Sequence, residues 1–293
     1  MASLNDLQNR MKSVRDTRKI TNAMYLISSA KMRRARRDME ASRPHFYASQ
    51  AVIGDILRNL PNIVHPCIGD TLEAPRPGKT GYLVITGDKG LAGAYNHNVL
   101  KLMGELDKDP AQSVIYTIGE VGLHSARSMG YPVDIEMHYP AQDPNISRAR
   151  DLSARLMEKY LSGELSEIIL VYTSLHKTVT EVTYRRLLPL YRAEFTDFMP
   201  PDDHRPPVYL PSPQAVLDTV VPNYLTGFLL DVMVEACCAE LDARMIAMQS
   251  ATENADEMLS VLSLEANRAR QEAITQEITE IASGARAQKK KQP

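Results

Sequence analysis

Apolar residues in the C-terminal part of the chain recur at alternating steps of three and four, a spacing typical of the seam of a coiled coil. The seam first runs through Leu225, Leu229, Val232, Ala236, Ala239, Ala243 and Ile246. Its phase slips across residues 249–254, and it resumes through Ala255, Leu259, Leu262, Ala266, Ala269 and Ala273, then Ile274, Ile278 and Ile281. Because no proline interrupts this run and Gly227 is its only glycine up to Ser283, we predict one helix over residues 223–286. At 1.5 Å per residue it would be roughly 90 Å long, too long for burial in one ordinary domain.

The N-terminal part of the chain carries a similar pattern. Residues 1–43 contain neither proline nor glycine, and the three-four spacing runs through Leu4, Leu7, Met11 and Val14. The next seam positions, Arg18 and Thr21, are polar, and a displaced stripe takes over at Ile20, Met24 and Ile27. Since the helix can continue past Pro44, we predict it over residues 1–60.

Charge favours the pairing of these two helices. Residues 1–43 hold eleven Lys or Arg against four Asp or Glu, whereas residues 223–283 hold three basic residues against eleven acidic ones. Helices of opposite charge that share apolar seams should lie together, although each exposed ion pair contributes only about 0–1 kcal/mol. We therefore predict an antiparallel coiled coil of the two ends of the chain. Spacing alone leaves open a bundle of separate amphipathic helices.

The middle of the chain, residues 78–193, alternates short apolar runs with amphipathic ones. Strands are predicted at Tyr82–Thr86, Ser113–Ile118, Val133–Met137, Ile168–Thr173 and Val179–Leu188. Helices are predicted near Asn98–Leu106, Val121–Met129 and Ile146–Leu161. This alternation predicts a Rossmann-like α/β domain with a largely parallel sheet, inserted between the two long helices. Proline is frequent in residues 194–222, which we expect to form an extended connection.

Composition narrows the class of protein. The chain has 293 residues, a formal net charge of −2, 44% hydrophobic and 24% charged residues, as expected of a soluble globular protein. No apolar stretch approaches the roughly 20 residues that cross a bilayer, so we expect no direct insertion into one. The N-terminus lacks a signal-peptide core, which favours a cytoplasmic location. The three cysteines, Cys67, Cys237 and Cys238, do not make a disulfide framework and are expected to be buried thiols.

One loop raises the question of nucleotide binding. Residues 87–93 (GDKGLAG) follow a predicted strand and precede a helix, where dinucleotide folds hold phosphate. The glycine spacing is G-x-x-G-x-x-G rather than G-x-G-x-x-G, which favours a tight turn instead. Gly78-Lys79-Thr80 resembles the end of a P-loop, but it precedes a strand and position 73 is glutamate, so we reject it.

Other chemistry is not indicated. The histidines show no paired metal-ligand spacing, and Cys-x-x-Cys and G-x-S-x-G are absent from the sequence, so no cofactor, metal or catalytic residue is assigned. The densest basic patch is Lys31, Arg33, Arg34, Arg36 and Arg37. Nucleic acid or acidic lipid could bind such a patch, but no aromatic residue is interleaved with it. A protein partner with acidic loops is therefore favoured over nucleic acid.

Several of these segments resemble a known family, the gamma subunit of F-type ATP synthases. The N-terminal signature is similar at residues 20–24 (ITNAM) and 29–35 (SAKMRRA), and the C-terminal one at 243–245 (ARM), 251–255 (ATENA) and 267–277 (NRARQEAITQE). Residues 90–96 (GLAGAYN) and 187–190 (LLPL) also fit in the middle of the chain. The resemblance covers nearly the whole chain in order.

The resemblance implies a non-catalytic rotor that couples ion-driven rotation to ATP synthesis or hydrolysis. Its coiled coil would stand inside a head of alpha and beta subunits, and its α/β domain would meet the epsilon subunit and the membrane ring of c subunits. The complex would lie at the cytoplasmic face of a bacterial membrane, with this chain as a peripheral part. The contact residues implied by the resemblance are Met24, Lys31, Arg33, Arg34, Arg36, Arg244, Arg270, Gln271 and Thr275. Arg244 would lie within the shaft, and Arg270, Gln271 and Thr275 would contact the head.

Two other functions remain as alternatives. A coiled-coil adaptor or scaffold protein, not involved in ATP synthesis, would use the same long helices without a catalytic head. A nucleotide-dependent enzyme would use the α/β domain and would bind ATP or NAD as an isolated chain.

Overall fold

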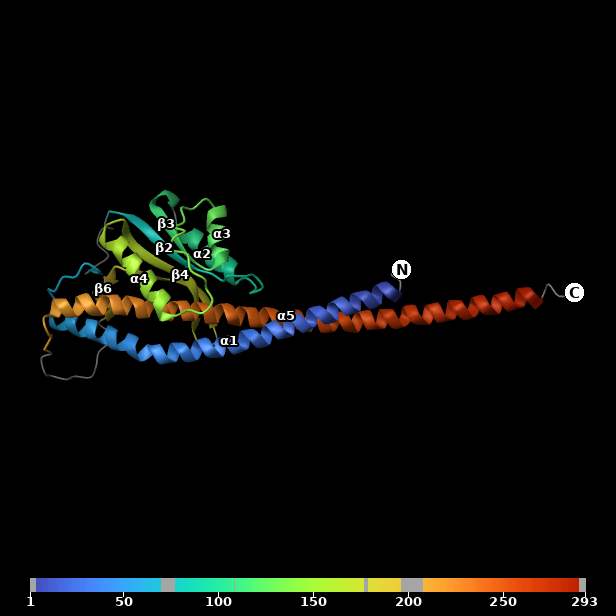
Figure 1. The fold of residues 1–293 in the computed structure, drawn as a ribbon. Coiled ribbons are helices and arrows are strands. Elements are labelled where there is room, and N and C mark those ends of the chain that lie inside the picture. Colours follow the sequence, from blue (N-terminus) through green and yellow to red (C-terminus); the bar gives the residue numbers. More distant parts are fainter. Residues whose placement is uncertain (1–3, 70–76, 108, 177–178, 196–207, 290–293) are drawn as a thin grey trace. The chain divides into compact units, whose positions relative to one another are not determined.

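The computed structural model describes residues 4–69, 77–107, 109–176, 179–195 and 208–289 (Figure 1). The chain divides into two compact units, each of which we describe by itself. Unit 1 comprises Met1–Ile27 and Met245–Pro293, and unit 2 comprises Ser28–Arg244. Two long helices, α1 (Leu4–Asn59) and α5 (Pro213–Lys289), each contribute residues to both units.

Unit 2 contains a four-stranded sheet in the order β3-β2-β4-β5. Its strands are β2 (Lys79–Ile85), β3 (Ser113–Ile118), β4 (Leu165–His176) and β5 (Val179–Leu188). Strand β2 pairs in parallel with both β3 and β4, and β5 returns antiparallel to β4. A second sheet pairs β1 (Ile68–Gly69) with β6 (Leu190–Tyr191), and short 3-10 turns lie at Pro110–Gln112 (η1) and Arg192–Phe195 (η2). The predicted α/β domain with a largely parallel sheet is confirmed.

Helices cover both faces of the four-stranded sheet. They are α2 (Tyr95–Leu106), α3 (Glu120–Ser128) and α4 (Ile146–Leu161), and the Asn145 side chain caps α4 by accepting from the Arg148 amide at 3.1 Å. Successive residues of a strand point to opposite faces. Accordingly Tyr82 and Val84 pack in a cluster with α2 and α3, whereas Leu83 and Ile85 pack in a larger cluster with α4, α1 and α5.

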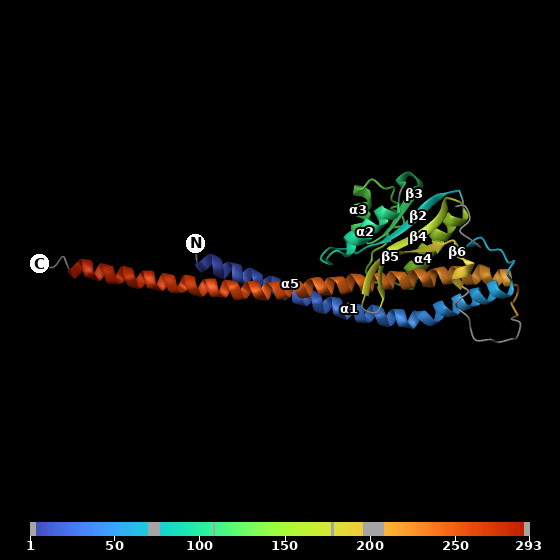
Figure 2. The same cartoon turned by 180° about the vertical axis from the view of Figure 1, so that it is seen from behind.

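The sheet of unit 2 is fixed to α5 by the hairpin of β4 and β5 (Figure 2). The Ser174 hydroxyl donates to the Glu235 carboxylate at 2.6 Å, and the Leu175 amide donates to the same oxygen at 3.2 Å. The Arg185 guanidinium lies 4.7 Å from the centre of the Phe228 ring. The hairpin therefore contacts α5 through both charge and aromatic surface.

Within unit 2, α1 and α5 meet through aromatic rings. The Phe46 ring stacks on Tyr224 and Phe228, with ring centres 5.2 and 6.3 Å apart. Gly227 makes this approach possible, because a Cβ there would lie 3.1 Å from Cδ2 of Phe46. The only glycine of the predicted C-terminal seam thus stands against Phe46 of α1.

Within unit 1, the same two helices pair antiparallel. The hydroxyls of Thr21 and Thr252 are 2.7 Å apart, and Arg18 Nε lies 2.6 Å from Asp256 Oδ1. Four residues of unit 1 form a buried apolar seam: Leu7, Met248, Ala255 and Leu262. The predicted antiparallel coiled coil is confirmed in each unit, and the alternative of several separate helices is wrong, because α1 and α5 are continuous over 56 and 77 residues.

One predicted boundary is wrong. Helix α5 begins at Pro213 rather than 223 and contains Pro222, so the residues at the end of the expected 194–222 connection are helical. Pro213 costs little because the first helical residue has no partner for its N–H group. Leu217 and Val221 are fully buried, and this burial offsets the hydrogen bond missing at Pro222. Residues 196–207 of the expected connection lie outside the described part of the chain.

A second prediction, the strand at Val133–Met137, is also wrong. This segment follows the edge of β3, but its backbone pairs with that strand through isolated bridges, from Val133 to Ile115 and from Tyr139 to Ile118. Pro132 and Pro140 flank it, and proline cannot donate to a ladder of hydrogen bonds. In contrast, β3, β5 and α4 have the predicted bounds.

The aromatic contact between α1 and α5 yields a stability prediction. Phe228 is 4% exposed and touches Phe46, Tyr224 and Arg185. Phe228→Ala should lower the free energy of unfolding by about 3–5 kcal/mol, since it removes a buried ring and leaves a cavity. Urea unfolding followed by circular dichroism measures the change. Leu161→Ala, at a half-exposed position, serves as control and should cost under about 0.5 kcal/mol. Equal effects of the two substitutions would contradict this packing.

Candidate functional site

All five side chains of the basic patch of α1 are exposed, and Lys31 and Arg36 also contact other elements of unit 2. The Lys31 ammonium donates to the Gln142 side chain at 3.3 Å, and Arg43 Nε lies 3.8 Å from Asp231 Oδ1 on α5. Arg36 lies beside Cys238: burial raises the pKa of that thiol, and the Arg36 charge opposes the rise. Lys31 and Arg36 therefore already have contacts inside unit 2.

The rest of the patch consists of Arg33, Arg34 and Arg37, which are also exposed. Arg33 donates to the Ser29 hydroxyl at 2.9 Å, and Arg34 lies 3.9 Å from Asp38. In that ion pair the side chains are 77% and 69% exposed, so it is weak and easily exchanged for another partner. These arginines form what we call the outer basic face of α1.

Arg244 is an internal residue of unit 2. Its Nη2 atom lies 2.6 Å from Glu240 Oε1 and donates to the backbone carbonyls of Gly90 and Lys89 at 3.3 and 3.5 Å. Glu240 is only 5% exposed. Burial raises the pKa of this carboxyl, and the Arg244 guanidinium opposes the rise. The pair stands one helical turn apart on α5 and faces the loop of residues 87–93.

That loop is built for close packing against α5. A Cβ at Gly87 would lie 2.6 Å from Glu240 Oε1, so a larger residue there would displace the Glu240 carboxylate. The Gly87 amide donates to the Asn96 side chain at 2.8 Å. Phosphate-binding loops turn N–H groups toward their ligand. Here two loop carbonyls accept from Arg244 and the Glu240 carboxylate fills the space beside Gly87, which supports the tight-turn interpretation.

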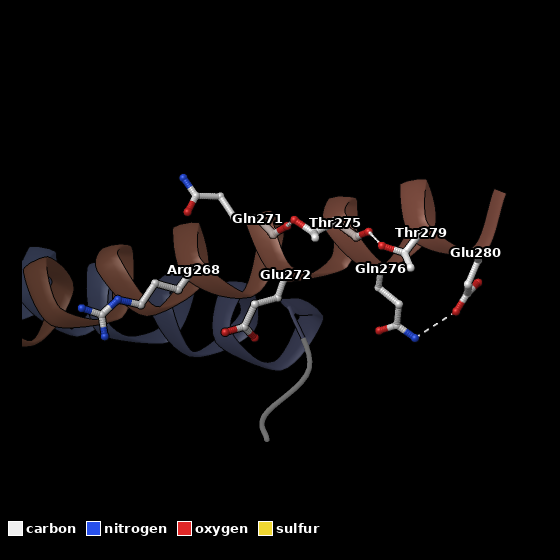
Figure 3. Close-up of a pocket in the computed structure, with 7 residues that line it drawn as sticks. All are labelled: Arg268, Gln271, Glu272, Thr275, Gln276, Thr279 and Glu280. Carbon is white, nitrogen blue, oxygen red and sulfur yellow. Dashed lines mark hydrogen bonds between the residues drawn. The ribbon is translucent and has the colours of Figure 1, made fainter. Parts of the chain in front are cut away.

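The remaining predicted contact residues lie in unit 1. Met24 is half-buried, whereas Arg270, Gln271 and Thr275 are exposed on α5. The Thr275 hydroxyl donates to the Gln271 carbonyl at 2.8 Å. Figure 3 shows the shallow groove on this part of α5, lined by Arg268, Gln271, Glu272, Thr275, Gln276, Thr279 and Glu280. These side chains spread around the helix instead of converging on one point, so the groove suits a protein surface better than a small ligand.

The last part of α5 extends past the start of α1. The contacts of Thr21 with Thr252 and of Arg18 with Asp256 set the register, which places Leu4 near Ala269. Described residues from Gln271 to Gly284 are all exposed. They include a stripe of three isoleucines, Ile274, Ile278 and Ile281, which are 49%, 61% and 67% exposed. An apolar stripe of this kind on a single helix indicates a surface for a partner.

Two negative findings apply to the part of the chain that the structure describes. Its histidines, cysteines and carboxylates form no group of three able to hold a metal ion. Across those residues, every helix is too short or too polar to cross a membrane.

Sequence reasoning missed several residues that matter. Glu240, Asp88, Gln142 and Asn96 organise the loop next to α5. A signal for Glu240 was available: a Glu and an Arg four residues apart beside an otherwise apolar seam indicate a buried ion pair. Asp88, Asn96 and Gln142 of the α/β domain lie in no sequence pattern that indicates these contacts.

These features define a class of protein. It is a two-helix coiled-coil protein with an inserted α/β domain, whose exposed surfaces suit protein partners. A sequence model of the family described as ATP synthase matches residues 3–288.

Full-length relatives identify the family. The ATP synthase gamma chain of Caldanaerobacter subterraneus subsp. tengcongensis is 39% identical over 291 residues, covering 96% of this chain and 98% of the relative. The gamma chain of Acetobacterium woodii, described as sodium ion specific, is 36% identical over 301 residues and covers 97% and 98%. The chain therefore belongs to the ATP synthase gamma-chain family.

Solved structures share the fold. A chain in the rotary-state-3 structure of the Euglena gracilis mitochondrial ATP synthase has a TM-score of 0.64 and 14% identity, covering 97% of this chain and 94% of that one. A chain in the central stalk and c-ring structure from Tetrahymena thermophila has a TM-score of 0.56 and 20% identity, covering 79% and 99%.

The inward ion pair of Arg43 and Asp231 generates a pH prediction. Burial raises the pKa of Asp231 above its ordinary 3.8, although Arg43 opposes this. The folded chain therefore holds that proton more tightly than the unfolded chain, and stability is lost as the pH rises through the raised pKa. Asn cannot ionise, so the stability of Asp231→Asn relative to the parent chain should improve between about pH 4 and pH 7.

Urea unfolding at several pH values measures this difference. Glu105→Gln, at an exposed position of α2, is the surface control. A stability difference between Asp231→Asn and the parent that does not change with pH would show that burial does not govern this carboxyl.

Proposed function

We propose that this chain is the central-stalk rotor of an F-type ATP synthase, which couples ion-driven rotation of a membrane ring to ATP synthesis or hydrolysis in a head of alpha and beta subunits. Its family membership supports this role, because the relatives named above are ATP synthase gamma chains matched over nearly their whole length. A rotor needs stiff helices and surfaces for partners. It needs no nucleophile or metal of its own, so we assign this chain a non-catalytic part.

The observation that carries the proposal is the unpaired end of α5. From Gln271 to Gly284 the helix is exposed, with Ile274, Ile278 and Ile281 uncovered. A single helix of this length is marginal in water, and most helical stability comes from packing of an apolar face. Alpha and beta subunits arranged in a ring around this segment would cover the three isoleucines. Arg270, Gln271 and Thr275 would contact the same ring of subunits at its edge.

The outer basic face supplies a second contact with the head. Arg33, Arg34 and Arg37 are exposed, and an acidic loop of the beta subunits would complement them, with Met24 half-buried nearby in sequence. We assign Arg33 and Arg34 from the family resemblance and add Arg37 from its exposure. Lys31, Arg36 and Arg244, which the resemblance also implied as contacts, are assigned instead to contacts within unit 2.

The other proposed partners follow from the family. The α/β domain would meet the epsilon subunit and the c-ring, and the assembly would lie peripherally at the cytoplasmic face of a bacterial membrane. One relative is described as sodium ion specific, so either protons or sodium ions are compatible with the proposal as the driving ion.

Charge reversal on the outer basic face tests the head contact. The triple variant Arg33→Glu, Arg34→Glu and Arg37→Glu should lower ATP turnover of the reconstituted complex by about tenfold, since three attractive contacts become repulsive. Because exposed charges are screened, the loss should shrink at high salt. The readout is steady-state ATP hydrolysis with co-purified alpha and beta subunits.

A matched control reverses charge elsewhere. Lys101→Glu with Arg150→Glu changes two exposed residues of the α/β domain and should leave turnover near that of the parent. If the triple variant matched this control at every salt concentration, the assignment of the outer basic face would be wrong. If no alpha or beta subunit co-purified even with the parent chain, the rotor proposal itself would fail, and an adaptor would be favoured.

A further inference from the structure

A route of polar contacts in unit 2 joins α1 to α5 through the α/β domain. On α1, Lys31 donates to the side chain of Gln142 at 3.3 Å. The backbone amides of Gln142 and Ala141 donate to the two carboxylate oxygens of Asp88 at 3.0 and 2.9 Å. Asp88 belongs to the loop of residues 87–93, so one side of this loop is tied, through Gln142, to α1.

The other side of the loop is tied to α5. The carbonyls of Lys89 and Gly90 accept from Arg244, and Arg244 is held by Glu240 at 2.6 Å. Directly beyond the loop, the Tyr95 hydroxyl donates to the carbonyl of Ala236 on α5 at 3.1 Å. Tyr95 and Ala239 pack with Ala92 in a small buried cluster of their own. The loop therefore bridges both long helices of unit 2.

The polar contacts of this route supply directional interactions, which the apolar core does not supply. The large core cluster packs the sheet and α4 on α5 through side chains such as Leu229 and Val232. The hydrophobic effect that drives this burial is non-directional. Charge-assisted hydrogen bonds fix direction, and they are roughly twice as strong as neutral ones.

We propose that this route, together with the hydrogen bonds of the β4–β5 hairpin to Glu235, provides rotational coupling between the α/β domain and the two long helices, with Asp88, Glu240 and Arg244 as positioning residues. The inference rests on the proposed rotor function. It identifies the contacts through which rotation would be transmitted between the α/β domain and the helices α1 and α5. It reassigns Lys31 and Arg244 from partner contacts to internal coupling. It also gives the glycine loop a role, since Gly87 lets Glu240 and the loop approach each other.

The coupling can be tested first on the full-length chain without partners. Asp88→Ala removes the acceptor for two amides, and Arg244→Met keeps most of the side-chain length but removes the donor. In both variants, amide hydrogen exchange in residues 87–93 should rise about tenfold, because local opening costs less once charged hydrogen bonds are lost. Exchange in β2, in the sheet core, should stay at the parent rate.

Control variants separate coupling from folding. Glu105→Ala removes an exposed carboxylate from α2, away from the route, and should leave loop exchange unchanged. If Asp88→Ala also raised exchange in β2, the domain would be unfolding, and Asp88→Asn, which retains one acceptor, would then decide. Parent-like loop exchange in Asp88→Asn and in Arg244→Met would overturn the proposal.

The second measurement uses the reconstituted complex in vesicles. Asp88→Ala should lower ion transport per ATP hydrolysed by about twofold or more, because a domain that pivots on the shaft loses part of each rotation. Glu105→Ala should keep the parent ratio. A parent ratio in Asp88→Ala, despite a mobile loop, would show that the route holds the loop but transmits no rotation. If the parent chain itself supports no ATP-driven transport, the rotor proposal fails, and the exchange result still stands on its own.

Discussion

The structure depends on one constraint: a long amphipathic helix is stable in water only when something covers its apolar stripe. In each unit α1 provides that cover for α5, through Phe46 in unit 2 and through the seam around Leu7 and Leu262 in unit 1. In unit 2 the sheet and α4 cover a further face of α5. Past the position of Leu4, every described residue of α5 from Gln271 to Gly284 is exposed, and a partner would cover the isoleucines there.

Charge has a different role from apolar burial. The basic residues of α1 and the acidic residues of α5 do not all pair with each other. Arg43 and Asp231 do, and so do Arg18 and Asp256, but Arg33, Arg34 and Arg37 face solvent, and Glu240 pairs with Arg244 of its own helix. Opposite charge therefore adds little to the pairing of the two helices, and the basic residues on the outer basic face of α1 remain available for another protein.

Much of the fold could be predicted because its signals are periodic. The three-four spacing predicted both long helices, and buried parallel strands are recognisable as short apolar runs such as residues 113–118. The start of α5 could not be predicted, because Pro222 favours a helix end locally, whereas Leu217 and Val221 are buried by residues distant in the sequence. The segment at 133–137 had the composition of a strand but is flanked by Pro132 and Pro140, which limit its pairing.

The candidate site was predictable in position but not in orientation. Composition located the basic patch, yet which side chains face outward depends on the phase of α1 against α5, and the seam of α1 is displaced near Thr21. The route from Lys31 through Asp88 to Arg244 joins segments far apart in the sequence, so no local pattern could indicate it.

The most direct test of the rotor assignment is electron cryo-microscopy of the native complex, captured with an antibody against the α/β domain. The account predicts one copy of this chain on the axis of a ring of alpha and beta subunits, with Ile274, Ile278 and Ile281 enclosed by that ring. A chain bound at the periphery, or a complex without alpha and beta subunits, would contradict it.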